Sequence, residues 1–298
     1  MRILVIGGTR FIGPYVIREL ASAGHQVAVY HRGSNEADLP SSVTQFHSPK
    51  AAMPVREFTP ETIAFRPEVV LHMVPMGEAD TKAALDAFRN IAKRMVAISS
   101  GDVYRAYGVF MGSEPGDAEP VPLTEGSPLR KNLYPYRKSA SGPAALEYIY
   151  DKILVERLVM NTPELPGTVL RLPKVYGPGE NADLATIYRY RHHPHWRWTH
   201  GYVENVAHAI ALAVVDERAK GRIYNVGEEM TPTIEERLKT LPVNDMPLDE
   251  RPANFAQDIV YDTTRIRSEL GFGEIVSYEE GIRRTLAATD RPMKTAQK

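Results

Sequence analysis

Short apolar runs and amphipathic stretches alternate along the first half of the chain. Apolar runs of strand length occur at residues 3–6, 27–30, 69–73, 95–98 and 168–172. Stretches with helical periodicity lie at residues 11–23, 79–93 and 147–160. Strands that alternate with helices predict the α/β class, here a doubly wound Rossmann sheet of parallel strands joined by right-handed crossovers.

The pattern becomes less regular after residue 173. Residues 203–215 are again helical in pattern and residues 222–226 resemble a strand, whereas residues 227–252 are rich in Pro, Glu and Thr. We therefore expect a dinucleotide-binding core at residues 1–173, completed by about 201–227. A small substrate-binding lobe would come from residues 174–200 and 228–298.

Composition excludes several classes of function. The 298 residues carry 36 basic and 37 acidic side chains, so no global field attracts nucleic acid or an anionic membrane. The absence of cysteine excludes disulfides, thiolate catalysis and cysteine-ligated metals. With neither a signal-like segment nor an apolar run of about 20 residues, we expect a cytoplasmic protein.

The first strand and the first helix are joined by a glycine-rich turn. Its residues are Gly7, Gly8, Thr9, Arg10, Phe11, Ile12 and Gly13. Glycine lets the backbone approach a pyrophosphate closely, and the start of a helix supplies unpaired N–H groups that favour an anion. The position of the turn at the first strand–helix junction therefore predicts a dinucleotide site.

Basic residues flank the expected position of the adenosine ribose. Sites that prefer NAD carry an acidic residue at the end of the second strand, and this chain has His31-Arg32 there. Arg10 and Arg32 could converge on a 2′-phosphate, which predicts NADP in preference to NAD. The competing interpretation is that both arginines are solvated surface residues.

Two segments have a tyrosine four residues before a lysine. Tyr148 and Lys152 fall on a predicted helix, where this spacing puts both side chains on one face and the ammonium lowers the pKa of the phenol. Tyr134 and Lys138 have the same spacing, but Pro135 and the residues that follow predict a loop. We therefore assign the acid/base role to Tyr148 and Lys152.

The order of motifs resembles the NAD(P)-dependent epimerase/dehydratase family of extended short-chain dehydrogenases/reductases. The segments that carry the resemblance are residues 7–13, 98–104, 148–156, 170–179, 224–227, 262–270 and 277–284. The resemblance implies a catalytic triad of Ser100, Tyr148 and Lys152. It also implies that Met73, Leu172 and both triad members Tyr148 and Lys152 contact the cofactor, and that the chain forms a homodimer through residues 79–93 and 147–160.

Several positions depart from the family pattern. Gly101-Asp102 stands where family dehydratases carry two acids, which disfavours a dehydratase, and Lys174 replaces an asparagine that contacts the diphosphate in many nucleotide-sugar epimerases. The bulky residues 73–76 replace small ones beside the nicotinamide. With Arg10 at the middle glycine position, the chain is similar to the atypical branch that includes chloroplast stem-loop RNA-binding proteins. We expect Ser100, Asp102 and Lys174 to contact the substrate.

Residues 189–198 interleave arginine, histidine and aromatic side chains. Arg191 and Trp196 are candidates for contacts with a nucleotide, because aromatic rings stack on bases and guanidinium groups bind phosphates. The alternative is a loop with packed tryptophans and solvated arginines. A metal site is not expected, because no carboxylate stands at ligand spacing from the histidines.

These residues predict an NAD(P)-linked oxidoreductase or epimerase that acts on the hydroxyl or ketone of a sugar-like substrate or nucleotide sugar. An NADPH-dependent ketone or aldehyde reductase is one alternative. An RNA-binding protein that retains the fold is another, motivated by the atypical branch and by residues 189–198.

Overall fold

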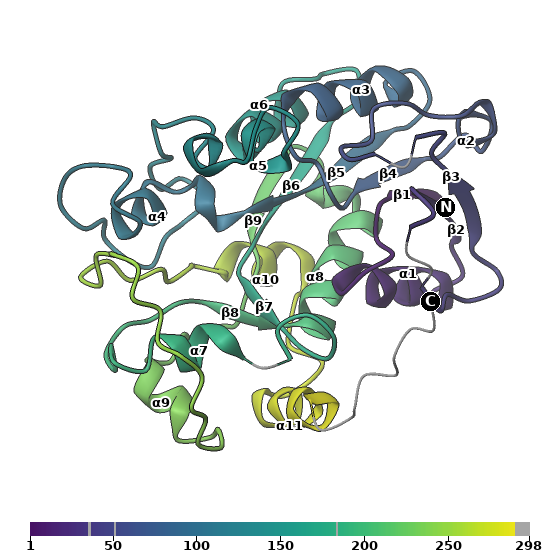
Figure 1. Cartoon of the computed structure of the whole chain (residues 1–298). Helices are drawn as coiled ribbons and strands as arrows, with labels where there is room; N and C mark the ends of the chain where they lie inside the picture. The colour runs from purple at the N-terminus through teal and green to yellow at the C-terminus, as the bar shows by residue number, and fades with distance from the viewer. Residues whose placement is uncertain (35–36, 51, 183, 290–298) are drawn as a thin grey trace.

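A seven-stranded parallel sheet forms the centre of the computed structural model (Figure 1). The structure describes residues 1–34, 37–50, 52–182 and 184–289. The strands lie in the order β3-β2-β1-β4-β5-β6-β9, which confirms the predicted Rossmann-like sheet. Their bounds are Arg2–Ile6 (β1), Gln26–His31 (β2), Thr44–His47 (β3), Val69–His72 (β4), Arg94–Ser100 (β5), Gly167–Leu172 (β6) and Arg222–Asn225 (β9).

Helices cover both faces of this sheet. On one face α1 (Ile12–Ser22) packs against α8 (Val203–Val215), and on the other α3 (Glu78–Phe88) packs against α6 (Lys152–Met160) (Figure 1). Alternate residues of β1 belong to the two separate apolar cores beneath these helix pairs. Burial on both faces explains why the strands appear in the sequence as continuous apolar runs.

The remaining elements are short, except for the 12-residue helix α11. They are α2 (Pro60–Ala64), α4 (Arg105–Phe110), α5 (Leu146–Ile149), β7 (Lys174–Tyr176), α7 (Ala185–Arg189), β8 (His200–Tyr202), α9 (Ile234–Leu238), α10 (Thr264–Leu270) and α11 (Tyr278–Thr289). β7 and β8 pair in parallel as a separate two-stranded sheet. The division of the chain into a core and a substrate-binding lobe stays a prediction.

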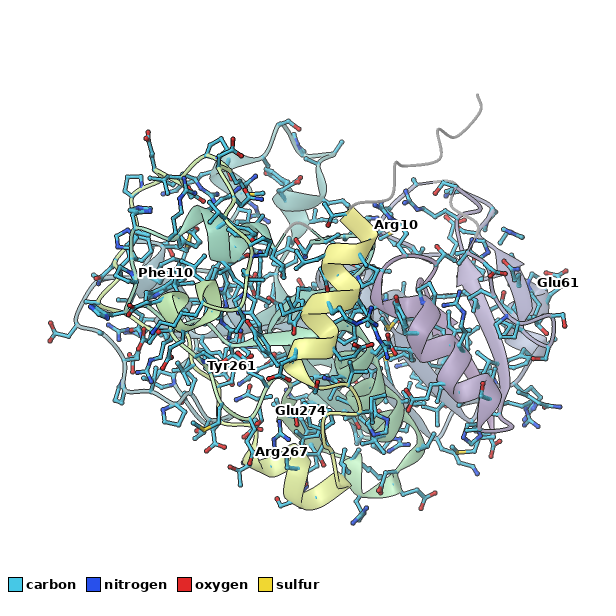
Figure 2. The ribbon with its side chains drawn as sticks, turned by 90° about the horizontal axis from the view of Figure 1, so that it is seen from below. Arg10, Glu61, Phe110, Tyr261, Arg267 and Glu274 are labelled. Carbon is cyan, nitrogen blue, oxygen red and sulfur yellow. The ribbon has the colours of Figure 1, made fainter. Side chains whose placement is uncertain are left out.

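A cluster of aromatic side chains joins α4 to the segments that follow β7. In this aromatic cluster Phe110 stacks on Trp196 with ring centroids 4.7 Å apart, and Trp198 and Phe255 pack edge-on against Phe110. Figure 2 shows Phe110 and Tyr261 on one side of the molecule, and Arg10 and Glu61 on the other.

The single helix predicted at residues 147–160 is wrong. The chain leaves the helical conformation at Tyr150 and Asp151, so that α5 ends at Ile149 and α6 begins at Lys152. The reason is the Asp151 carboxylate, which accepts hydrogen bonds from the backbone N–H groups of Ile153 (2.9 Å) and Leu154 (3.3 Å) and so caps α6. Tyr148 and Lys152 therefore do not lie on one face of a continuous helix.

Within the ranges described above, every helix is too short or too polar to cross a bilayer.

Candidate active site

The glycine turn is shaped by close contacts that leave no room for side chains. A Cβ at Gly13 would lie 2.2 Å from the carbonyl oxygen of Gly8, so the start of α1 packs directly on the turn. A Cβ at Gly7, where φ is +82°, would lie 2.7 Å from a methyl carbon of Val74. This is the close backbone geometry that a pyrophosphate site requires.

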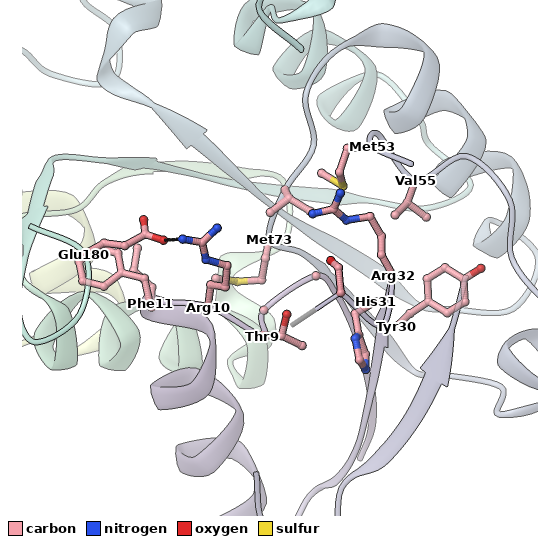
Figure 3. Close-up of a pocket in the computed structure, with 15 residues that line it drawn as sticks. Thr9, Arg10, Phe11, Tyr30, His31, Arg32, Met53, Val55, Met73 and Glu180 are labelled. Atoms are coloured by element: carbon pink, nitrogen blue, oxygen red, sulfur yellow. Dashed lines mark ion pairs between the residues drawn. The ribbon is translucent and has the colours of Figure 1, made fainter. Parts of the chain in front are cut away.

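A cavity of about 310 Å³ opens beside this turn (Figure 3), and we call it the glycine-turn cavity. Nine residues predicted to bind the cofactor line it: Gly7, Gly8, Thr9, Arg10, Phe11, Ile12, His31, Arg32 and Met73. Sequence reasoning missed further lining residues, among them Tyr30, Ser34, Met53, Val55, Val74 and Glu180. The cavity lies at the carboxyl ends of β1 and β2, where doubly wound sheets bind dinucleotides.

Charged groups line the outer part of the glycine-turn cavity. An Arg10 guanidinium nitrogen lies 2.6 Å from a Glu180 carboxylate oxygen, and both side chains are more than half exposed. The buried His31 ring accepts a hydrogen bond from the Gly33 N–H (3.2 Å) and contacts the Gln45 side chain (3.1 Å). The described lining contains no carboxylate at the end of β2, so the residues present fit a dinucleotide without the usual acidic contact to the ribose.

A second cavity of about 480 Å³ lies at the carboxyl ends of β5 and β6, and we call it the β5–β6 cavity. The described residues that line it are Met76, Ser100, Gly101, Asp102, Tyr107, Tyr136, Leu146, Glu147, Tyr150, Leu172, Pro173, Lys174, Trp198 and Tyr261. The structure thus brings together four residues predicted for the site, namely Ser100, Asp102, Leu172 and Lys174. Neither cavity has Tyr148 or Lys152 among the described residues that line it.

Ser100 and Asp102 begin a single turn at the end of β5. The Ser100 hydroxyl accepts a hydrogen bond from the backbone N–H of Asp102 (3.3 Å). The Asp102 carboxylate is buried, and its Oδ2 accepts a hydrogen bond from the Tyr136 hydroxyl (3.0 Å). Burial raises the pKa of Asp102, although the nearby Arg130 opposes that shift.

Tyr150, rather than Tyr148, faces Ser100. Tyr150 lines the β5–β6 cavity together with Ser100 and Asp102, and burial, which is the largest effect, raises the pKa of this phenol well above 10. The half-buried Tyr148 ring instead lies under the guanidinium of Arg137, 4.6 Å from its centroid. Because of the break before α6, Tyr150 occupies the position beside Ser100 that was expected for Tyr148.

Lys152 lies behind the β5–β6 cavity, below the loop that follows β4. Its buried ammonium donates to the backbone carbonyls of Pro75 and Ile98 and lies 5.6 Å from the centre of the Tyr150 ring. Burial lowers the pKa of Lys152 to about 8, and the carboxylates of Asp102 and other acids oppose the shift. The Lys152 ammonium can therefore lower the pKa of Asp102 without lining the cavity itself.

Comparison with known proteins identifies the family. The model of the NAD dependent epimerase/dehydratase family matches residues 3–227. The chain belongs to this family.

Solved epimerase structures have the same fold. A UDP-glucose 4-epimerase from Thermotoga maritima, determined with UDP-glucose, is 20% identical with a TM-score of 0.69, and the match covers 97% of this chain and 98% of that one. A UDP-glucose 4-epimerase from Thermus thermophilus, in complex with NAD, is 22% identical with a TM-score of 0.66 and the same coverage of both chains. At these identities the likeness concerns the fold alone.

A curated relative differs in length. The 2′-dehydrokanamycin reductase of Streptomyces kanamyceticus is 28% identical over 187 residues, which cover 61% of this chain and 45% of the reductase. The chain therefore matches less than half of the length of that relative.

In this member of the epimerase/dehydratase family, a glycine at position 101 is required by packing. A Cβ at Gly101 would lie 1.3 Å from the hydroxyl oxygen of the buried Tyr261. The phenol thus occupies the space into which an acidic side chain at residue 101 would project. This contact gives a physical reason for the missing acid of the dehydratase pair.

The segment at residues 189–198 is partly buried, with Tyr190 and Trp196 inside and Arg189 and His195 exposed. Trp196 is only 2% exposed and its indole N–H donates to the Gln257 carbonyl (2.7 Å), and Arg191 donates to the carbonyls of Tyr188 and Met246. Trp198, which sequence reasoning did not select, lines the β5–β6 cavity, with the Lys174 ammonium 5.4 Å from its ring. Two amphipathic residues two positions apart are equivalent in the sequence, and only the tertiary packing distinguishes them.

Proposed function

We propose that this enzyme moves hydride between NADP(H) and the hydroxyl or ketone carbon of a sugar-like substrate or nucleotide sugar, as an oxidoreductase or epimerase. The observation that carries the proposal is the presence of the glycine-turn cavity and the β5–β6 cavity at the carboxyl ends of one parallel sheet, joined by the loop that follows β4. Structurally similar proteins were solved with UDP-glucose or UDP-glucuronic acid, which supports this substrate class. The curated relative, named 2′-dehydrokanamycin reductase, supports net reduction as one form of the reaction.

The residues of this chain have separate parts in the proposed reaction. When bound, the nicotinamide cofactor accepts or supplies the hydride. The glycine turn would hold its pyrophosphate, and Ser100 would orient the substrate oxygen in the β5–β6 cavity. A tyrosine paired with Lys152 would exchange the hydroxyl proton. The family pattern assigns this role to Tyr148.

The aromatic cluster weighs against the RNA-binding alternative. Tyr190 and Trp196 are buried in it, so they present no open face on which a base could stack. The predicted homodimer and the cytoplasmic location stay predictions.

The preference for NADP over NAD is tested by titrating NADPH and NADH against wild type and Arg32→Ala, with cofactor fluorescence as the signal. Loss of a charge-assisted contact to the 2′-phosphate should raise the Kd for NADPH about 10- to 100-fold, and the Kd for NADH should change little. Arg157→Ala, which removes an exposed arginine on α6, is the matched control.

Equal weakening of NADPH and NADH in Arg32→Ala would show that Arg32 does not select a 2′-phosphate. If wild type bound neither cofactor, the enzymatic proposal itself would be refuted.

A further inference from the structure

One carboxylate oxygen in the β5–β6 cavity wall has no partner. Asp102 is 5% exposed, and its Oδ2 accepts a hydrogen bond from Tyr136, whereas its Oδ1 is buried without any hydrogen-bond donor among the described residues. A buried, unsatisfied carboxylate oxygen is costly unless a proton or a donor arrives during function. Asp102 is therefore placed to hold a proton.

Tyr150 lies between this carboxylate and the open part of the β5–β6 cavity. It is more exposed than Asp102, and it lines the same cavity wall as Ser100 and Asp102. Its ring also packs against Tyr136, with centroids 5.3 Å apart. A substrate oxygen bound at Ser100 would therefore meet the Tyr150 hydroxyl.

The backbone holds Tyr150 in this position through several independent contacts. The Asp151 carboxylate caps α6 and pairs with the Arg130 guanidinium (3.2 Å), and both groups are almost completely buried. The Asp151 N–H donates to the carbonyl of Met76 (2.9 Å). Restoring a continuous helix, which would bring Tyr148 above Lys152, would require all these contacts to break.

We propose that Tyr150, with Asp102 behind it as the positioning and proton-holding residue, exchanges the hydroxyl proton with the substrate in place of Tyr148. This assignment rests on the proposed hydride-transfer function. It concerns a tyrosine two residues from the position that the family pattern marks.

The proton balance follows from the arrangement. During oxidation the carbinol C–H bond breaks and its hydride passes to the oxidised cofactor, while the substrate O–H proton passes to the Tyr150 oxygen and the phenol proton passes to the Asp102 carboxylate. During reduction every transfer is reversed, and neutral Asp102 returns the proton. Because burial raises the pKa values of both Tyr150 and Asp102, the resting pair is a neutral phenol beside a carboxylate that binds a proton readily.

The charges and phenols around the Asp102 carboxylate set its titration. They come from several segments and are Tyr107, Arg130, Tyr136, Tyr150, Lys152 and Tyr261. Oxidation needs the ionised carboxylate, so its rate should rise with pH as Asp102 loses its proton, and the rate of reduction should fall over the same range.

The test measures single-turnover hydride transfer from reduced-nicotinamide absorbance, in the oxidation direction with UDP-glucose and NADP⁺ and in the reduction direction with diacetyl and NADPH. Tyr150→Phe should slow the transfer about 10²- to 10⁴-fold without changing the Kd for the cofactor. Tyr148→Phe should slow the transfer far less than Tyr150→Phe does. Tyr134→Phe, at a tyrosine that is not among the described residues lining either cavity, is the matched control and should retain the wild-type rate. In Asp102→Asn the rate of oxidation should no longer rise with pH in the range where Asp102 loses its proton.

Loss of activity in Tyr148→Phe with retention in Tyr150→Phe would overturn the assignment, as would an unchanged pH profile in Asp102→Asn. If wild type binds cofactor but turns over neither probe, the proposed substrate class fails, and the tyrosine assignment is decided separately by ¹³C NMR of protein labelled at tyrosine Cζ. One signal, absent from Tyr150→Phe, should follow a carboxyl titration that Asp102→Asn abolishes. Absence of that coupled signal would refute the Tyr150–Asp102 pair.

Discussion

Acid should destabilise the protein through His72, a fully buried histidine at the end of β4. Within the described part of the chain neither of its ring nitrogens has a hydrogen-bond partner, and burial, with the Lys152 ammonium nearby, lowers its pKa from 6.5 to about 3. Because the unfolded chain binds the proton more tightly, the contribution of His72 to stability is complete above pH 6.5 and is lost as the pH falls toward 3. At pH 4.5, with about 1.4 kcal/mol per pH unit, the loss is about 3 kcal/mol.

The measurement is the free energy of unfolding in urea for wild type and His72→Leu at pH 7 and at pH 4.5. Leucine cannot titrate, so the difference between the two proteins should shift in favour of the variant by about 3 kcal/mol on acidification. His195→Leu, which changes an exposed histidine, is the control. A difference for His72→Leu that is the same at both pH values would refute the conclusion that His72 stays neutral in the folded protein.

Two further substitutions test the cofactor turn and the helix break. In Gly13→Ala the new methyl group would lie 2.2 Å from the Gly8 carbonyl oxygen, so the free energy of unfolding should fall by about 1–3 kcal/mol. The rise in melting temperature that NADP⁺ produces should also be lost. Gly24→Ala, at a positive φ but in open space, is the control and should keep that rise. In Asp151→Ala the buried guanidinium of Arg130 loses its carboxylate partner, so the free energy of unfolding in urea should fall by about 3–5 kcal/mol. A variant as stable as wild type would contradict the importance of the helix cap and the ion pair.

The sheet was predictable where burial is complete. The run at residues 69–73 corresponds to β4 (Val69–His72), and the helical pattern at residues 203–215 coincides with α8. β3 (Thr44–His47) was missed, because this edge strand is largely exposed and carries a polar sequence that no apolar pattern marks. Edge strands have only one neighbour, so their sequence is less constrained by packing.

The error at α5 and α6 had a local signal that the tyrosine–lysine spacing concealed. An aspartate just before the first turn of an apolar helical pattern is a typical N-cap, and Asp151, with only Lys152 between them, precedes Ile153 and Leu154. The second tyrosine–lysine pair, Tyr134 and Lys138, was predicted to lie in a loop. The structure has no α-helix there and shows only a short 3-10 turn at Arg137–Ser139. Spacing has a facial meaning only after the helix boundaries are known.

Other parts of the site could not be read from local sequence. Glu180 and Met53 line the glycine-turn cavity although they lie far along the chain from the turn, and neither occurs in a motif. Long-range packing brings them to the cavity, and a single sequence does not show which distant residues are close in space. The same applies to Tyr261, whose hydroxyl determines which residue can stand at position 101.

The loop after β4 links the two cavities and explains why family membership leaves the substrate open. Met73 and Val74 line the glycine-turn cavity, while Met76 lines the β5–β6 cavity. The same loop fixes the start of α6, because a Cβ at Gly77 would lie 2.3 Å from the carbonyl oxygen of Ile149 and the Pro75 carbonyl accepts from Lys152. Bulky residues in this loop therefore alter the cofactor wall, the substrate wall and the position of the tyrosine together, while the parallel sheet that defines the family is unchanged.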